Sequence, residues 1–132
     1  MSDKDLAGAE QGIFTVGDDF LYVLLVENDE ATEQTPALHV VFTLPTELEF
    51  VSGQGRGITV SGSGVTARSS EFRLDKHESA TIELRVRAKA VPPGGLTKAE
   101  ASVRAAGEIE LSNETESTTL RGEIPATPIA SR

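Results

Sequence analysis

The sequence predicts an all-β protein with the architecture of an antiparallel β-sandwich. Between Thr81 and Lys89, aliphatic and polar side chains alternate residue by residue, and Lys98–Ala105 repeats the pattern with alanines and a valine. A period of two places one set of side chains in a core and the other in water, as expected for a strand. Turn-forming residues separate several more short apolar runs, and none of these runs resembles a capped amphipathic helix. The alanine content of Lys98–Ala105 leaves a helix as the competing interpretation there, although the alternation and the preceding Pro-Pro-Gly-Gly favour a strand.

Seven further strands are predicted from short runs of β-branched, aromatic and aliphatic residues. In chain order they are Ile13–Val16, Phe20–Glu27, Ala37–Leu44, Leu48–Val51, Ile58–Val60, Val65–Arg68 and Glu71–Leu74. Glycine, proline, aspartate and asparagine mark the turns between them, including a glycine run at 53–57 that is expected to be a flexible loop. Within these turns, Asn28 is expected to adopt the left-handed conformation, and Pro45 ends a strand because it lacks a ladder donor.

Composition bounds the class of protein. The chain has 132 residues, 12 basic against 21 acidic side chains and a formal net charge of −9. This length suits one domain. An acidic chain with 5% aromatic residues is poorly suited to nucleic acid, whose phosphates it repels. It also contains no cysteine, no apolar run long enough for a membrane helix and no recognisable signal peptide.

The expected organisation is a flexible lead-in at residues 1–11, one β-sandwich at 12–122 and a C-terminal linker at 123–132. The first eleven residues are polar and lack a periodic apolar pattern. The last ten are rich in proline and small residues, as is typical of a linker.

Four segments together resemble a known pattern, and the longest is Val16–Asn28 (VGDDFLYVLLVEN). It is followed by Thr43–Val51 (TLPTELEFV), Leu74–Ser79 (LDKHES) and Ser112–Ser117 (SNETES). The combination resembles the conserved-repeat domain of bacterial surface proteins, the family called domain of unknown function eleven. The resemblance implies an immunoglobulin-like sandwich of about seven to nine strands, used in series as a non-enzymatic spacer, stalk or adhesive unit. Because the shared residues lie in the core and turns, the pattern bears on the fold more than on the function.

The chain departs from that family in ways that suggest an interaction face. Leu21, Val23 and Leu25 stand where the family has threonine, and they point outward if Phe20 and its alternate neighbours form the core. Leaving large aliphatic side chains in water forgoes roughly 1.5–3 kcal/mol of burial each. Either the N-terminal segment or a loop covers them, or they form a contact face for a neighbouring domain or a second copy. Two other departures are Phe42 in place of an aspartate and Glu47 in place of a glycine.

A basic stripe is predicted on the outer face of one strand, from Arg85, Arg87 and Lys89, with Arg68 and Arg73 as further members. It is expected to pair locally with Glu71 and Glu83 or to dock on the acidic first third of a neighbouring module. With the three outward aliphatic residues, Arg85, Arg87 and Lys89 make up the predicted interaction face.

Acidic residues near one end of the sandwich are weak candidates for a calcium site. The candidates are Asp18, Asp19, Asp29 and Glu30, with Glu27 and Glu33 nearby. Clustered carboxylates can supply the oxygens that calcium requires, but no recognised calcium-loop pattern is present, and a run of acids is usually a solvated face. No metal or cofactor is therefore predicted.

The sequence predicts no catalytic residues. His39 and His77 lack the partner spacing of known catalytic motifs and are expected on a strand surface and in a turn. The chain is therefore interpreted as a structural or interaction module of a larger exported bacterial protein, at the cell surface or outside the cell. Its expected partners are neighbouring domains or other surface proteins, with weak self-association left open. The alternative is a module that binds calcium or carbohydrate through its acidic and glycine-rich loops, although a single tyrosine and no tryptophan weaken the carbohydrate version.

Overall fold

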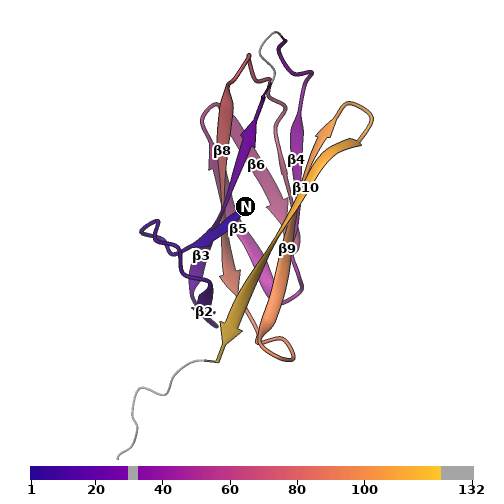
Figure 1. Cartoon of the computed structure of the whole chain (residues 1–132). Coiled ribbons are helices and arrows are strands. Elements are labelled where there is room, and N and C mark those ends of the chain that lie inside the picture. The colour runs from indigo at the N-terminus through magenta and orange to yellow at the C-terminus, as the bar shows by residue number, and fades with distance from the viewer. Residues whose placement is uncertain (30–32, 123–132) are drawn as a thin grey trace, which may run out of the picture.

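The computed structural model describes residues 1–29 and 33–122, and within them the chain forms ten β-strands and no helix (Figure 1). The described residues therefore contain no helix of the length and apolarity that crossing a membrane requires. The strands are β1 (Ser2–Lys4), β2 (Ile13–Thr15), β3 (Asp19–Glu27), β4 (His39–Thr43), β5 (Leu48–Gly55), β6 (Ile58–Ser63), β7 (Thr66–Ser69), β8 (Ser79–Ala88), β9 (Leu96–Ala105) and β10 (Ile109–Arg121). The all-β prediction is confirmed, with ten strands where seven to nine were expected.

The strands form two layers of an immunoglobulin-like sandwich. Along the hydrogen-bonded order they run β1-β3-β8-β5-β6-β7-β4-β9-β10-β2. β6 pairs with β5 in one layer and with β7 in the other, so it joins the two layers at one side. Every pairing is antiparallel except that of β10 with β2, which is parallel. β2 and the end of β10 lie together at the lower end of the molecule in Figure 1.

The core lies between the layers and follows the predicted period of two. In β8, the side chains of Ile82, Leu84 and Val86 are fully buried, and in β3 those of Phe20 and Tyr22 are. β4 and β9 of the opposite layer contribute further buried side chains, which are Val40, Phe42, Ala99, Ala101 and Val103. Lys98–Ala105 lies within β9, which confirms the strand and excludes the alanine-rich helix.

The glycine run predicted as a flexible loop is instead part of the sheet, so that prediction is wrong. Gly53 and Gly55 belong to β5 and pair with β8, and only Arg56 and Gly57 turn the chain into β6. A Cβ atom on Gly53 would lie 2.8 Å from Val60, and one on Gly62 would lie 2.4 Å from the carbonyl oxygen of Thr66. These glycines are therefore required because neighbouring strands approach closely where the sheet passes between layers.

Two other expectations differ from the structure. Residues 2–4, expected in a flexible lead-in, form β1 and pair with Leu21–Val23 of β3. Glu71–Leu74 is not a strand, since its only ladder contact is a single bridge between Phe72 and Leu38. The predicted linker at 123–132 lies outside the described residues.

Asn28 has a different role from the one expected. It is not among the residues with a left-handed backbone, and its side chain is buried. Its amide nitrogen donates to the carbonyl oxygens of Glu33 at 2.9 Å, Asp75 at 3.0 Å and Leu74 at 3.3 Å. Asn28 thus ties the end of β3 to two neighbouring loops through their carbonyl groups.

Candidate functional site

The predicted interaction face occupies the outer side of the β3–β8 layer. The antiparallel register places Asp19 opposite Arg87, Leu21 opposite Arg85 and Val23 opposite Glu83. Residues directly opposite each other in such a pair share one face of the sheet, so the aliphatic and basic members of the predicted face lie side by side. Lys89 follows the last residue of β8, is exposed, and donates its backbone N–H to the carbonyl oxygen of Glu47 at 2.8 Å.

Asp19 holds the basic stripe. Its Oδ2 accepts a hydrogen bond from Arg85 Nε at 2.8 Å, and its Oδ1 accepts one from Arg87 Nε at 2.8 Å. The Asp19 side chain is only 7% exposed beneath the two guanidinium groups. Burial alone raises the pKa of this carboxyl group, but the hydrogen bonds and charges of Arg87 and Arg85 outweigh it and leave the pKa below its usual value.

This arrangement corrects two expectations. The local partner of Arg85 and Arg87 is Asp19, not Glu71 or Glu83, and Glu83 instead accepts a hydrogen bond from Gln54 at 3.2 Å. Asp19, a weak candidate for calcium, is engaged by two arginines, which it would have to release in order to bind a cation. The more distant arginines are elsewhere: Arg68 lies in β7 of the other layer, and Arg73 contacts the carbonyl oxygen of Thr35 at 3.4 Å.

The aliphatic half of the face is partly covered by the N-terminal segment. β1 pairs along Leu21–Val23, and these two aliphatic residues are half-buried. Leu6 and Leu21 line a shallow hollow of about 360 Å³ together with residues of β5 and β8. Leu25 lies beyond the end of β1 and remains 50% exposed. The N-terminal segment thus accounts for Leu21 and Val23, while Leu25 still needs an explanation.

The other acidic candidates do not form a metal site in the described part of the chain. Asp18 lies in the turn between β2 and β3, Asp29 is exposed, and Glu30 lies outside the described residues. Among residues 1–29 and 33–122, no three histidine, cysteine, aspartate or glutamate side chains gather closely enough to hold an ion.

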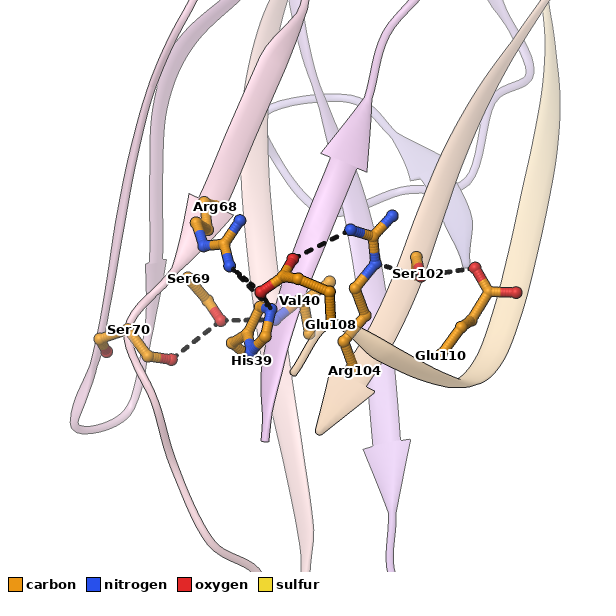
Figure 2. A network of polar contacts seen from close by, with 9 residues as sticks. All are labelled: His39, Val40, Arg68, Ser69, Ser70, Ser102, Arg104, Glu108 and Glu110. Carbon is orange, nitrogen blue, oxygen red and sulfur yellow. Dashed lines mark hydrogen bonds and ion pairs between the residues drawn. The ribbon is translucent and has the colours of Figure 1, made fainter. Parts of the chain in front are cut away.

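A second polar cluster, which the sequence reasoning missed, lies on the outer side of the other layer (Figure 2). Its centre is Glu108, in the turn between β9 and β10. Oε2 of Glu108 accepts from the Arg68 guanidinium at 2.5 Å and lies 3.2 Å from Nε2 of His39, while Oε1 accepts from Arg104 at 3.1 Å. On the far side of Arg104, Ser102 accepts a hydrogen bond from its Nε and donates one to Glu110 at 2.7 Å.

His39 is buried in this cluster, contrary to its predicted place on a strand surface. Its Nε2 lies 3.0 Å from the Arg68 guanidinium as well as near Glu108. In the tautomer protonated on Nδ1, Nε2 accepts from Arg68; protonated on Nε2, it donates to Glu108. His77 does lie in a turn, as predicted, with a φ of 57°.

Glu108 has an unusual backbone and an unusual acidity. Its φ of 59° lies in the left-handed region, which side chains other than glycine, asparagine and aspartate seldom adopt. The hydrogen bond from Arg68, with those to Arg104 and His39, outweighs the opposing effect of burial and lowers the pKa of its carboxyl group to about 2. The Glu108 carboxylate therefore joins its turn to the three strands β4, β7 and β9, and the hydrogen bond between Ser102 and Glu110 adds β10. The only sequence signal for it is the Arg104–Glu108 spacing across an Ala-Ala-Gly turn.

No family model and no curated protein sequence matches this chain. Solved structures, however, share its fold. The major pilin BcpA of Bacillus cereus superposes with a TM-score of 0.56 at 12% identity, over 91% of this chain and 39% of the pilin. The major pilin SpaD of Corynebacterium diphtheriae gives 0.51 at 13% identity, over 80% of this chain and 31% of the pilin.

A third structure of the same fold belongs to a protein of a different kind. AvmM, described as catalysing macrocyclization in alchivemycin A biosynthesis, gives a TM-score of 0.52 at 11% identity, over 96% of this chain and 90% of its own. Sequence identities this low establish the fold and leave function to be argued from the residues. The comparisons thus define the chain as an immunoglobulin-like β-sandwich of the kind found in bacterial pilins.

Proposed function

We propose that this domain is a non-enzymatic structural and interaction module of a larger exported bacterial protein, acting at the cell surface as a spacer or adhesive unit. The two pilins that it resembles support this proposal, because the chain corresponds to about a third of each, as one module of several would. Membership of the conserved-repeat family is part of the same proposal and rests on the four motif segments.

The observation that carries the proposal is the parallel pairing of β2 with β10. Ile13, Phe14 and Thr15 lie in register with Thr119, Leu120 and Arg121. The pairing is extended by two backbone hydrogen bonds, from Thr119 N–H to Gly12 at 2.9 Å and from Val16 N–H to Arg121 at 2.9 Å. It joins one of the first strands of the domain to the last strand.

This geometry suits a domain that transmits tension. In a parallel pair, the chain enters the first strand at one end of the ladder and leaves the last strand at the opposite end. Pulling on the chain therefore slides the two strands past each other, and the ladder hydrogen bonds, which lie across the strands, resist together. β1 precedes this ladder with only three residues, so it would detach first.

The polar clusters also support a structural role rather than catalysis. Asp19 is bound by Arg85 and Arg87, and Glu108 by Arg68, Arg104 and His39. Each cluster lies on the outer side of a sheet, and in each a single carboxylate is held between two arginines of the protein itself. A group that serves as general acid or base needs a proton exchangeable near neutral pH, and neither carboxylate has a pKa in that range.

Single-molecule force spectroscopy of a Thr119→Pro variant tests this proposal. Proline removes the N–H that bonds Gly12, and we expect a clear drop in unfolding force when the chain is pulled through its ends. Ser117→Pro is the matched control, since N–H groups two residues apart point to the same side of a strand and Ser117 lies beyond the end of β2. Equal forces for the wild type and Thr119→Pro, or an equal loss in both variants, would contradict the proposal.

A further inference from the structure

A groove lined by eight apolar and four polar residues opens between the two layers at the end of the sandwich opposite β2. It has a volume of about 340 Å³. Its walls come from the end of β3, the segment before β4, and the adjoining parts of β9 and β10. The apolar lining residues are Leu24, Leu25, Val26, Pro36, Leu38, Ala101, Val103 and Leu111. Leu25 and Leu111 on its rim are 50% and 54% exposed, so both side chains are accessible to a bound partner.

The groove exists because small side chains face inward where β10 leaves the sandwich. Register places Glu114 opposite Ala101 and Ser112 opposite Val103, so these four share the inner face of the layer. Ala101 and Ser112 do not fill the space above Leu24 and Val26. A bulge between Glu110 and Ser112 also breaks the ladder there, and the β9–β10 hairpin leans away from the other strands (Figure 1).

Two strand edges flank this groove without a partner strand in the described part of the chain. β2 covers only Thr119–Arg121 of β10, which leaves the outer edge of Ile109–Ser117 unpaired by any described strand. β1 covers β3 only as far as Val23, so the edge of Leu24–Glu27 is likewise open among the described residues. The backbone N–H of Thr119 points to this outer edge, where it bonds Gly12, whereas that of Leu120 points the other way, to Gly95. N–H groups alternate sides along a strand, so the N–H groups of Asn113 and Thr115 point to the outer edge as well.

The negative charge near the outer edge of β10 determines which kind of strand can pair with it. Residues 109–116 contain three glutamates and no basic residue, and exposed Glu27 adds a fourth carboxylate at the groove. The N-terminal ammonium of Met1 pairs with one of them, Glu114, which leaves the carboxylates in excess. The partly buried Glu116 has its pKa raised by burial and by Asp3, so additional negative charge there is unfavourable. Two copies of β10 paired edge to edge would set these carboxylates against each other, as acidic edges do to prevent self-association. A strand that carries lysine or arginine would be attracted instead.

We propose that the outer edge of β10 and the adjoining groove bind an extended segment of a partner protein in which basic and aliphatic residues alternate. The segment adds as a strand beside Ile109–Thr115, with its main chain bonded to Asn113 and Thr115. Its aliphatic side chains fill the groove over Ala101 and Leu38, and its basic side chains meet Glu27 and the glutamates of β10. Edge-strand addition gives affinity through the main chain and specificity through such alternate pockets. This surface is independent of the β2–β10 pairing, which lies at the other end of β10.

A ten-residue peptide that alternates valine with lysine is the probe. Three measurements are made on the whole chain: fluorescence anisotropy for affinity, amide hydrogen exchange for location, and sedimentation for self-association. We expect binding that weakens in 0.5 M salt, with new exchange protection at Asn113 and Thr115. A valine–glutamate peptide should not bind. A valine–lysine peptide whose backbone N–H groups facing β10 are methylated should bind at least tenfold more weakly than the unmethylated peptide.

Variants of the chain separate the groove from general charge attraction. Ser112→Phe fills the groove and should reduce affinity at least tenfold, whereas Ser117→Phe, on the exposed outer side of the same strand, should not. Glu27→Lys should weaken binding more than Glu71→Lys, which makes the same charge change away from the groove.

Three results would overturn the proposal. One is equal binding of the lysine and glutamate peptides, or no binding of either. Another is protection that appears elsewhere than at residues 109–115. The third is a dimer of the chain alone that already protects Asn113 and Thr115, since the occupant would then be a second copy.

Discussion

The hydroxyl groups of Tyr22 and Thr118 lie 2.8 Å apart in the core, although 96 residues separate them in the sequence. Oγ1 of Thr118 also bonds Oδ2 of Asp3 at 2.6 Å. Thr118 donates its single hydroxyl hydrogen to Asp3, so Tyr22 must donate to Thr118. All three side chains are buried, and they belong to β3, β10 and β1. One chain of hydrogen bonds thus fastens the N-terminal strand and the last strand to the centre of the sandwich.

Tyr22 should not ionise in the folded protein at pH values where tyrosine ordinarily does. Burial raises its pKa well above the usual value of 10.0, and the charges of Asp3 and Glu116 act in the same direction. The unfolded chain loses this proton near pH 10, whereas the folded chain keeps it. Tyr22 therefore does not affect the free energy of unfolding below pH 10, and it lowers that free energy as the pH rises above 10. Tyr22 is the only tyrosine, so its absorbance near 295 nm reports on it directly. A normal titration in the folded state would contradict the buried hydrogen bond.

Removing the middle of this chain of hydrogen bonds should be costly. Thr118→Val keeps the shape of the side chain but leaves the Tyr22 hydroxyl and the Asp3 carboxylate without their shared partner. We expect a loss of about 1–3 kcal/mol in the free energy of unfolding, measured by urea denaturation. Thr115→Val, at an exposed position of the same strand, is the control and should change stability by less than about 0.5 kcal/mol. Equal effects would mean that the buried bonds add little.

Asp19 should contribute to stability through its two arginines. Asp19→Asn removes the charge that pairs with both guanidinium groups, and we expect the free energy of unfolding to fall by about 1 kcal/mol at low salt. Because the folded pKa of Asp19 lies below its unfolded value, its contribution is present above pH 4 and is lost as the pH falls further. Urea denaturation at several salt concentrations measures this. A variant as stable as the wild type would show that the pairs are incidental.

The chain should not be stabilised by calcium. Of the acidic residues that cluster in the sequence, Asp19 accepts hydrogen bonds from Arg85 and Arg87, so it cannot lend its oxygens to a cation without giving them up. We expect the same melting temperature with millimolar calcium and with a chelator, measured by calorimetry. A calcium-dependent rise in melting temperature would contradict this and restore the ligand-binding alternative.

Glu108 should make the protein sensitive to acid. Its folded pKa of about 2 lies below the model-peptide value of 4.5, so its stabilising effect is complete above pH 4.5 and is lost as the pH falls from there through 2. Glu108→Gln should flatten the acid limb of stability against pH, whereas Glu71→Gln, which removes the same charge elsewhere, should not. Thermal denaturation between pH 2 and pH 6 tests this, and parallel acid limbs for the wild type and Glu108→Gln would contradict it.

The sequence predicts the core of this fold well and its polar contacts poorly, for a physical reason. The alternation along β8 fixes which side chains of Ile82, Leu84 and Val86 face inward, because the period of a strand is a local property. The pairing of Asp19 with Arg85 and Arg87 depends on which strand lies beside β8, and the cluster around His39 depends on four strands meeting. Such contacts need the register between distant segments, which no local pattern specifies.

β1 shows the same limit from another side. Met1–Lys4 has too few apolar residues to predict a strand, yet β3 offers it an open edge and Thr118 offers a partner for Asp3. Gly53 and Gly55 lie in a strand where the sequence predicts a loop, because glycine marks both loops and close strand contacts, and only the position of β6 distinguishes the two.

The direction in which the domain is pulled tests its proposed role most directly. The chain has no cysteine, so pairs of introduced cysteines give unique attachment points. Attachment at residues 11 and 122 loads β2 against β10 in shear, while attachment at 93 and 122 unzips the antiparallel β9–β10 hairpin from its open end, one bond at a time. We predict a several-fold higher unfolding force for the first pair. Equal forces in the two directions, or a lower force for the first, would contradict the proposal that this domain is built to bear tension.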